Sequence, residues 1–579
     1  MRVIRWFFGA VTLIVFLVVF FSWMSIIAGP AVEADSTLLV TLDGPLPEAP
    51  VVDLGVLLGD EPTQTLRSVV QSLERAAADE RIRGVVLDVG SAQIGFAQLE
   101  ELAGAMARFR ESGKFSIGFM ETAGEVTRGD GALALASLAD EVVVTPPGNV
   151  NLIGLRTEPM FYAGTFEKLG VDVHFEKRGA YKSAANQFTA TEMDPPMRES
   201  LDDVVGDLQN ELLALLAERR GVSKETVAEW IKMGPYLAPE AVQLGIVDRL
   251  AYWDEVSSEV EQRVGRDDSL VSVARYWLEG RPHVQGTSIA LLFGEGVVTR
   301  GDAGGGFGDD AVMASDRIIR ALREIRDTDA EALIFRVDSP GGSYIASDLI
   351  RREVELTRAA GIPVIISMGN LAASGGYFVA MDADHIMASA GTLTGSIGVY
   401  NGMFNIGGAL RQVGVTTDSL QTAPNADAFS TLAPIDARRR AIVAKFADRV
   451  YVDFTTKVAE KRNLPLSAVQ QVAQGRVWSG RDALTHNLVD SIGGLQEAIN
   501  QARTLAELSP DAPIRLDVWP QTEDPAEVLR SALRGTVRST EALERARAPL
   551  EAASRLWRSL GAVRGDTPLL LPAALPSLF

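Results

Sequence analysis

The fold is decided by a stretch of sequence that occurs twice, as ADEVVVTPPGNVNLIGL at residues 139–155 and as ADHIMASAGTLTGSIGV at residues 383–399. The offset from 139 to 383, 244 residues, places Gly154 on Gly398. Repeats of solenoid proteins are only about 20–50 residues long. An offset of this length therefore indicates two homologous domains in tandem rather than a repeat array.

The pattern within each repeat predicts the same class of fold. We place the repeats at 36–280 and 285–505, and in the second one LIFRV (333–337), PVIIS (363–367) and HIMAS (385–389) have the composition of strands. SDLIRREVELTRAA, between the first two runs, has helical spacing. Strand, helix and strand in this order predict parallel βαβ units with right-handed crossovers. We expect an α/β fold in which helices cover a sheet or spiral.

Composition narrows the class of protein. The chain has 579 residues, of which 47% are hydrophobic and 23% are charged, as in globular proteins with a large core. Its net charge of −21 argues against nucleic acid as a partner. Cysteine is absent, so the chain has no disulfide, thiolate metal site or cysteine nucleophile. We expect neither a metal nor a cofactor. A histidine mechanism would have to use one of only four residues, His174, His283, His385 and His486.

The N-terminus has the composition of a membrane anchor. No charged residue occurs from Trp6 to Val32, whereas a spanning helix needs about 20 apolar residues and a cleavable signal has a shorter core. Arg2 and Arg5 precede the run, and the positive-inside rule keeps such an end in the cytoplasm. We expect residues 1–32 to form a cytoplasmic tip and an uncleaved anchor, with Trp6–Gly29 in the bilayer and the body on the far side.

Two other segments stand apart from the repeats. GDAGGGFGDD at 301–310 is rich in glycine but lacks the Lys-Ser or Lys-Thr of a phosphate-binding loop, so a flexible loop is the better interpretation. Residues 521–579 contain many arginines and end in an apolar tail. We expect a separate helical extension there, of unknown role.

Two loops of the second repeat carry residues suited to acyl-transfer chemistry. DSPGG, Asp338 to Gly342, follows a predicted strand, and its glycines leave backbone N–H groups accessible as oxyanion donors, although a tight turn explains it equally well. GNLAASGGYFVA places Ser374 among small residues at the start of a helix. A serine there is usually only an N-cap, but the N–H of Gly375 would point at an incoming carbonyl oxygen.

A nucleophilic serine needs a base, and the repeat suggests which residue it is. His385 lies only eleven residues after Ser374, in the next strand, with no reason to fold back. GAYKSAANQF offers Lys182, which would be an ordinary surface lysine unless burial lowers its pKa. The offset places Ala426 on Lys182 and Asp130 on Ser374. Each repeat thus lacks what the other has, which predicts one composite site per chain.

Over about residues 1–505, the chain resembles the long form of signal peptide peptidase A, the family of membrane-bound Ser/Lys proteases called protease IV. The features that carry the resemblance are the anchor, both repeats, and the motifs GAYKSA, SPGG and AASGGY. The resemblance implies two tandem Clp/crotonase-like (ββα-spiral) domains after an N-terminal transmembrane helix. The first repeat would supply the lysine base, and the second would supply the serine and the oxyanion hole. The residues it implies are Ser374 as nucleophile, Lys182 as general base, the N–H groups of Gly342 and Gly375 as oxyanion hole, and Ser396, otherwise a turn hydroxyl, as a group that holds the lysine.

The same resemblance implies an assembly and a substrate. It predicts a homotetramer on the periplasmic face of a bacterial inner membrane, acting on hydrophobic signal-peptide remnants left in the bilayer. Two alternatives are a crotonase-like acyl-CoA enzyme, which needs no Ser/Lys pair, and a catalytically inactive membrane scaffold. Export argues against the acyl-CoA enzyme because CoA is cytoplasmic. Reaction with a serine-directed fluorophosphonate would argue against the scaffold.

Overall fold

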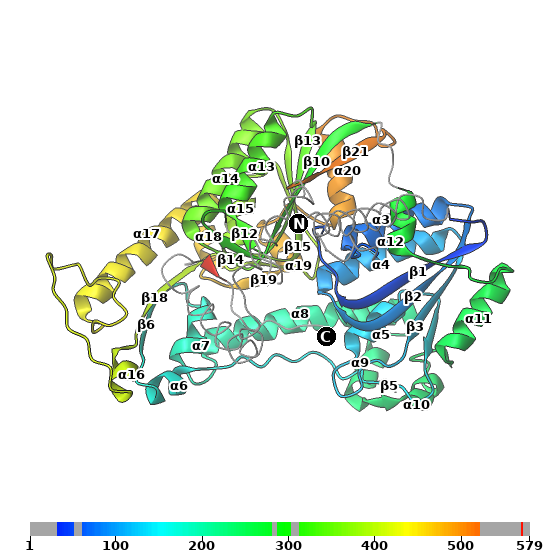
Figure 1. The fold of residues 1–579 in the computed structure, drawn as a ribbon, viewed down its shortest axis with the longest axis horizontal. Coiled ribbons are helices and arrows are strands. Elements are labelled where there is room, and N and C mark those ends of the chain that lie inside the picture. Colours follow the sequence, from blue (N-terminus) through cyan, green and yellow to red (C-terminus); the bar gives the residue numbers. More distant parts are fainter. Residues whose placement is uncertain (1–31, 51–60, 281–285, 303–311, 521–568, 571–579) are drawn as a thin grey trace, which may run out of the picture. The chain divides into compact units, whose positions relative to one another are not determined.

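The computed structural model describes residues 32–50, 61–280, 286–302, 312–520 and 569–570, which form two compact units (Figure 1). The predicted anchor Trp6–Gly29, most of the loop 301–310 and nearly all of 521–579 lie outside the described residues. None of the helices in the described part of the chain combines the length and apolarity that a membrane span requires. The anchor therefore stays a prediction from sequence.

Unit 1 takes its described residues from Met1–Leu155 and Gln209–Gln285 and is built on a six-stranded, parallel sheet. In sheet order the strands are β8 (Arg249–Leu250), β4 (Glu141–Val144), β3 (Phe115–Met120), β2 (Ile82–Gln93), β1 (Ser36–Pro45) and β9 (Leu270–Ser272). Its helices include α3 (Leu66–Ala78), α4 (Phe96–Glu111), α5 (Asp130–Ala136), α9 (Lys224–Met233), α10 (Ala238–Gln243), α11 (Trp253–Val264) and α12 (Val273–Glu279). Two short strands, β5 (Asn149–Val150) and β7 (Tyr236–Leu237), pair beside this sheet.

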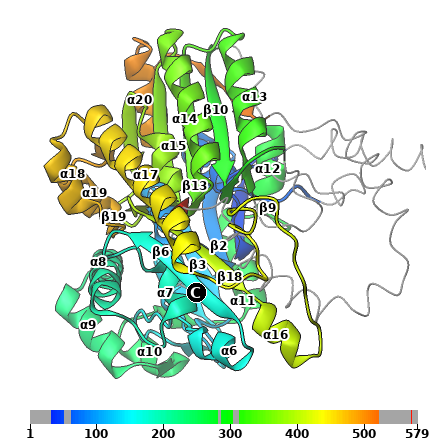
Figure 2. The same ribbon diagram turned by 90° about the vertical axis from the view of Figure 1, so that its left-hand side faces the viewer.

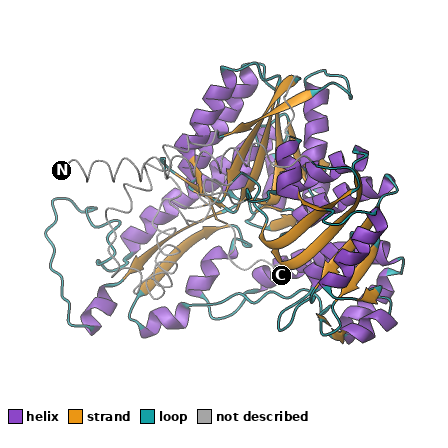
Figure 3. Ribbon diagram, turned by 45° about the vertical axis from the view of Figure 1, so that its right-hand side comes forward, coloured by secondary structure: helices purple, strands orange, loops and turns teal. Residues whose placement is uncertain are grey.

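Unit 2 comprises Arg156–Leu208 and Gly286–Pro576 and is built on an eight-stranded sheet. Its strands are β20 (Ser491–Ile492), β16 (His385–Ala388), β15 (Val364–Ala373), β13 (Ala332–Ser339), β10 (Thr287–Glu295) and β21 (Ile514–Trp519), with β17 (Leu393–Gly395) and β19 (Val477–Ser479) branching from β15. Its helices include α13 (Ser315–Arg326), α14 (Tyr344–Ala359), α15 (Gly375–Ala380), α17 (Ala437–Lys461), α18 (Leu466–Val472), α19 (Gly480–Thr485) and α20 (Leu495–Leu505). Figure 3 shows the strands of the sheet flanked by these helices.

The two sheets share one topology. In unit 1 the order β8-β4-β3-β2-β1-β9 matches β20-β16-β15-β13-β10-β21 of unit 2, strand for strand along the chain. The predicted α/β class is confirmed, and so are the predicted strands, which the structure contains as β13, β15 and β16, and the predicted helix, which is α14. A duplicated sequence has produced the same sheet twice.

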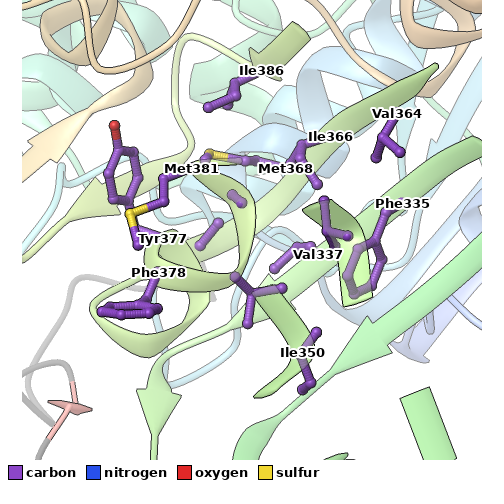
Figure 4. Close-up of a cluster of buried hydrophobic side chains, with 14 of the residues drawn as sticks. Phe335, Val337, Ile350, Val364, Ile366, Met368, Tyr377, Phe378, Met381 and Ile386 are labelled. Carbon is purple, nitrogen blue, oxygen red and sulfur yellow. The ribbon is translucent and has the colours of Figure 1, made fainter. Parts of the chain in front are cut away.

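The core of unit 2 lies between its sheet and the helices α13, α14, α15 and α17 (Figure 4). Side chains alternate between the faces of a strand, and Phe335, Val337, Ile366 and Met368 on β13 and β15 are all fully buried in this core. Helix α17 adds Ala447, Val450, Phe454 and Val458, whose spacing of three or four residues places them on one helix face. This rigid core supports the loops at the ends of β13 and β15.

An arm of unit 2 is built from both repeats. Strand β6 (Asp172–Arg178) pairs antiparallel with β18 (Val399–Asn405), and α17 packs along both strands (Figure 2). Around them lie α6 (Ala163–Lys168), the 3-10 turn η1 (Ser183–Ala185), α7 (Asn186–Thr189) and α16 (Gly407–Gln412), and α8 (Pro195–Arg220) follows. Phe166, Phe175, Phe188 and Phe404 form one aromatic cluster across the pair. Such contacts contribute about 0.5–1.5 kcal/mol each beyond their buried area.

This arm changes how the chain divides. We expected domains at 36–280 and 285–505, but 156–208 group with unit 2 because β6 and the aromatic cluster attach them to β18. Unit 2 also continues past residue 505, since β21 completes its sheet against β10. The compact units are therefore not the two sequence repeats, and Lys182 belongs to the same unit as Ser374.

Candidate active site

A buried hydrogen bond joins Ser374 and Lys182, whose Oγ and Nζ atoms lie 2.7 Å apart. Neither side chain has any solvent exposure. The sequence-based prediction that these two residues lie within hydrogen-bonding distance is confirmed, and both belong to unit 2. Two residues almost two hundred positions apart thus form a single contact.

The register of β6 and β18 explains how Lys182 reaches the serine. Arg178 at the end of β6 lies opposite Val399 at the start of β18. The chain is antiparallel here, so the residues that follow Arg178 run back along those that precede Val399. Lys182 comes four positions after Arg178 and Ser396 three before Val399, which brings the two together. Pairing outside the site therefore sets the position of the lysine.

Ser396 provides two acceptors for the amine of Lys182. Nζ lies 3.0 Å from the Ser396 carbonyl oxygen and 3.0 Å from its hydroxyl oxygen. Burial holds the pKa of Lys182 well below its ordinary value, because the charged form loses its hydration there. A neutral amine has two N–H donors and one lone pair. Donation of both protons to Ser396 leaves the lone pair for the Ser374 hydroxyl.

The backbone of Ser374 is strained. Its φ of 56° and ψ of −111° lie in a region that non-glycine residues rarely adopt, at a cost of about 1–3 kcal/mol. Although Ser374 precedes α15, its side chain makes no capping hydrogen bond to that helix. The ordinary N-cap interpretation is thus wrong, and the hydroxyl instead faces Lys182. The Ser374 N–H donates to the Gly395 carbonyl at 2.8 Å, which fixes the turn.

The two glycine loops meet beside the serine. A Cβ added to Gly375 would lie 2.8 Å from the amide nitrogen of Gly342, so only glycine allows this approach. Gly342 itself forms a two-residue strand with Gly341, β14 (Gly341–Gly342), which pairs with β11 (Val297–Thr299). As the first residue of α15, Gly375 has an N–H with no acceptor within its own helix. Both predicted oxyanion donors therefore lie together at Ser374.

Sequence reasoning missed Gly475, which packs directly against Lys182. Its φ is +77°, and a Cβ there would lie 2.5 Å from the Lys182 Cβ. The neighbouring Gln474 carbonyl accepts the Tyr181 N–H at 2.9 Å, so this turn also supports the lysine loop. Gly475 is one of 53 glycines and stands in no recognisable motif. No signal in the sequence could have found it.

Arg476, the next residue, was missed too, and it fastens the lysine loop from outside. It pairs with Glu199 at 2.7 Å and with Asp203, both on α8. Its guanidinium lies 4.7 Å from the ring centre of Tyr181, the residue before Lys182. These contacts hold the loop against the turn that contains Gly475.

The remaining predicted candidates lie elsewhere. The ring of His385, on β16, hydrogen-bonds the Ser491 hydroxyl at 2.8 Å, whereas Ser374 bonds Lys182. Within the described ranges, no cluster of three or more His, Cys, Asp or Glu side chains is arranged to hold a metal ion. The site can supply a hydroxyl, a buried amine and two backbone N–H groups.

The counterpart of Ser374 in the first repeat is a carboxyl group that accepts backbone hydrogen bonds. Asp130 begins α5 and is fully buried, and its Oδ1 accepts the N–H groups of Ile153 and Gly154 at 3.2 and 2.7 Å. Burial raises the pKa of this carboxyl. Its Oδ2 has no hydrogen-bond partner among the described residues.

Comparisons with known proteins find relatives of this chain among the peptidases. The profile of peptidase family S49 matches residues 122–267 and 357–509. Protease 4 of Salmonella typhi is 31% identical over 495 residues, which cover 82% of this chain and 77% of that protein. The chloroplastic serine protease SPPA of Arabidopsis thaliana is 30% identical over 455 residues, covering 77% and 66%. The solved structure of ClpP1 from Listeria monocytogenes is 12% identical and covers 36% of this chain and 94% of that one. Its TM-score of 0.23 is too low for a structural argument.

The buried lysine predicts how stability depends on pH. In the unfolded chain a lysine keeps its proton up to about pH 10.4, whereas the lowered pKa of folded Lys182 releases it earlier, so stability rises with pH in this window. Between pH 8 and pH 10, the free energy of unfolding of unit 2 in urea should rise with pH. The rise should be steeper than in Lys182→Met by up to about 1.4 kcal/mol per pH unit. Equal slopes in the two chains would contradict a neutral lysine.

Asp130 predicts the opposite dependence. Because burial raises its pKa, the stability that it contributes is present below about pH 4 and is lost as pH rises. Asp130→Asn keeps an Oδ1 acceptor for the two N–H groups and removes the charge. We expect its Tm at pH 7 to exceed that of the unsubstituted chain by about 2–4 °C. The difference should vanish near pH 3, and a lower Tm at pH 7 would show that the carboxylate is stabilising.

Proposed function

Because this chain belongs to peptidase family S49 and is a serine protease, we propose that Ser374 and Lys182 form its catalytic dyad. The observation behind the proposal is their buried 2.7 Å hydrogen bond, made by a lysine whose pKa burial has lowered. A lysine without its proton is a base, and a serine needs such a base to attack a carbonyl. The alternative of an inactive scaffold gives no reason to bury this pair.

The mechanism uses the hydrogen bonds in sequence. The Nζ lone pair of Lys182 takes the Ser374 proton as Oγ attacks the carbonyl carbon of the scissile peptide. The N–H groups of Gly342 and Gly375 stabilise the oxyanion, and the protonated lysine then donates its proton to the leaving amine. Water, activated in turn by Lys182, hydrolyses the acyl-enzyme and regenerates Ser374.

Ser396 has a positioning role in this proposal. Its carbonyl and hydroxyl oxygens fix two of the amine's protons, so the lone pair is directed at Ser374. The carbonyl cannot be removed by mutation, so Ser396→Ala would leave one of the two contacts. Its loss of activity should therefore be much smaller than that of Ser374→Ala.

The N-terminus and the resemblance are the basis of a proposal for the substrate and the location. We propose that the chain is held in a bacterial inner membrane by Trp6–Gly29, with its body in the periplasm, as a homotetramer. An anchored protease with a dry site suits hydrophobic signal-peptide remnants, which remain in the bilayer after cleavage. The support is the uncharged run Trp6 to Val32, flanked by Arg2 and Arg5.

Substitutions at the dyad test the mechanism. Ser374→Ala and Lys182→Ala should each lower kcat for a hydrophobic peptide by at least about a thousandfold, because members of one catalytic unit fail together. Lys182→Arg is the decisive variant, since arginine keeps the charge but cannot lose its proton in a protein. We expect it to be as inactive as Lys182→Ala.

Lys177→Arg is the matched control for that experiment. Lys177 lies on β6, close to Lys182 in sequence, but its Nζ pairs with Asp194 at 3.3 Å, whereas that of Lys182 contacts the serine. It should keep most of its activity. Substantial turnover by Lys182→Arg would show that only the positive charge matters, and the dyad would then be wrong even with Ser374 essential.

A reporter fusion tests the orientation. Alkaline phosphatase, which folds only outside the cytoplasm, should be active when fused after Phe579, and green fluorescent protein fused there should not fluoresce. The physical reason is the positive charge of Arg2 and Arg5 on the cytoplasmic side of the uncharged run. The opposite result would mean that the body stays in the cytoplasm.

A further inference from the structure

The end of the chain forms a strand on the glycine loop of the site. Leu569 and Leu570 make up β22 (Leu569–Leu570), which pairs antiparallel with β14 so that Leu569 lies opposite Gly342 and Leu570 opposite Gly341. The same strand packs against β18, and Figure 1 shows it in red beside β14. A segment more than two hundred residues along the chain therefore returns to this loop.

Strand β22 is an edge strand of the sheet that contains β14. One edge of β14 is taken by β11, through Val298 opposite Gly342, and β22 takes the other edge. Gly375, next to Ser374, approaches the Gly342 nitrogen and the Gly341 Cα from α15. Any extended peptide paired in this way with β14 is held beside the serine.

The sequence around β22 suits a short extended ligand. It reads TPLLLPAALPSLF from Thr567 to Phe579 and contains no charged side chain. Pro568 and Pro572 enclose the three leucines, and neither proline can donate a ladder hydrogen bond. A residue before proline also favours an extended backbone. The two prolines thus confine such pairing to the leucines between them, of which Leu571 directly precedes a proline.

We propose that this C-terminal tail is a built-in ligand of the strand to which extended apolar peptides bind, and that it competes with them within the same chain. The inference rests on the proposed function in that those peptides are the substrates. Backbone pairing along β14 gives affinity without demanding a particular side chain. A tethered ligand acts at an effective concentration of about a millimolar, so even weak pairing would occupy the strand.

Hydrogen–deuterium exchange tests the occupancy without any need for catalysis. In the Ser374→Ala chain, which cannot cut the tail, amides of residues 339–345 should exchange faster after removal of 566–579. The double variant Leu569→Pro/Leu570→Pro should behave like the truncation, because proline lacks the N–H that a ladder needs. Removal of 572–579 alone is the matched control and should leave exchange unchanged.

A binding measurement tests the competition. A labelled, uncharged leucine-rich peptide should bind the truncated Ser374→Ala chain about 2–10-fold more tightly than the full Ser374→Ala chain, as expected for removal of a weak tethered competitor. A synthetic tail peptide added to the truncated chain should restore slow exchange, and the same peptide N-methylated at both paired leucines should not. Equal affinities, or equal exchange in the full and truncated chains, would overturn the proposal.

The two proposals can fail separately. If the unsubstituted chain cleaves peptides but truncation changes neither exchange nor affinity, the tail is not a ligand and the protease stands. If no peptide is cleaved while truncation speeds exchange and tightens binding, the tail is a ligand of a peptide-binding site and the dyad mechanism is wrong. In active chains, truncation should lower KM and leave kcat unchanged, whereas a merely structural tail would lower kcat and Tm on removal.

Discussion

The pairing of β6 with β18 is the interaction on which the site depends. It carries Lys182, from the first repeat in sequence, to a serine in the second, and its register fixes where the amine lies. A slip of one residue would move the lysine by about 3.3 Å and turn its side chain to the other face. The aromatic cluster around Phe175 and the ion pair of Arg178 with Asp448 hold that register in place.

The site contains two energetically unfavourable features, which the rest of unit 2 stabilises. Burial of Lys182 disfavours its charged form, and the backbone of Ser374 occupies a rarely populated region. Such features persist only where surrounding structure enforces them, and they concentrate at functional sites. Here the enforcement comes from the hydrophobic core that supports the loops at the ends of β13 and β15, and from Gly475, whose missing Cβ leaves room for the lysine. In the proposed mechanism, desolvation keeps the amine neutral and the strained turn aims the hydroxyl at it.

Local sequence patterns predicted the strands, the repeat and the pair Ser374–Lys182, because each depends on short-range composition or on a fixed offset. The grouping of 156–208 with unit 2 depends instead on which distant strands pair, and seven-residue runs such as β6 do not encode a partner. Gly475 was missed for a related reason, since its importance arises only from its contact with Lys182. Long-range contacts decide what local patterns cannot.

The two repeats have diverged so far that neither could recover a complete site by a single substitution. A serine at position 130 would lie at the same end of its sheet as Ser374 does in unit 2. The base would then have to come from the position equivalent to Lys182, which is Ala426, exposed in the loop after α16. That loop contains no strand corresponding to β6, so a lysine there would have no pairing to direct it. A base needs a suitable side chain and a strand pairing that positions this side chain beside the serine. Of the two equivalent segments, only the one that contains β6 has both. The predicted single site per chain therefore depends on strand pairing as much as on residue identity.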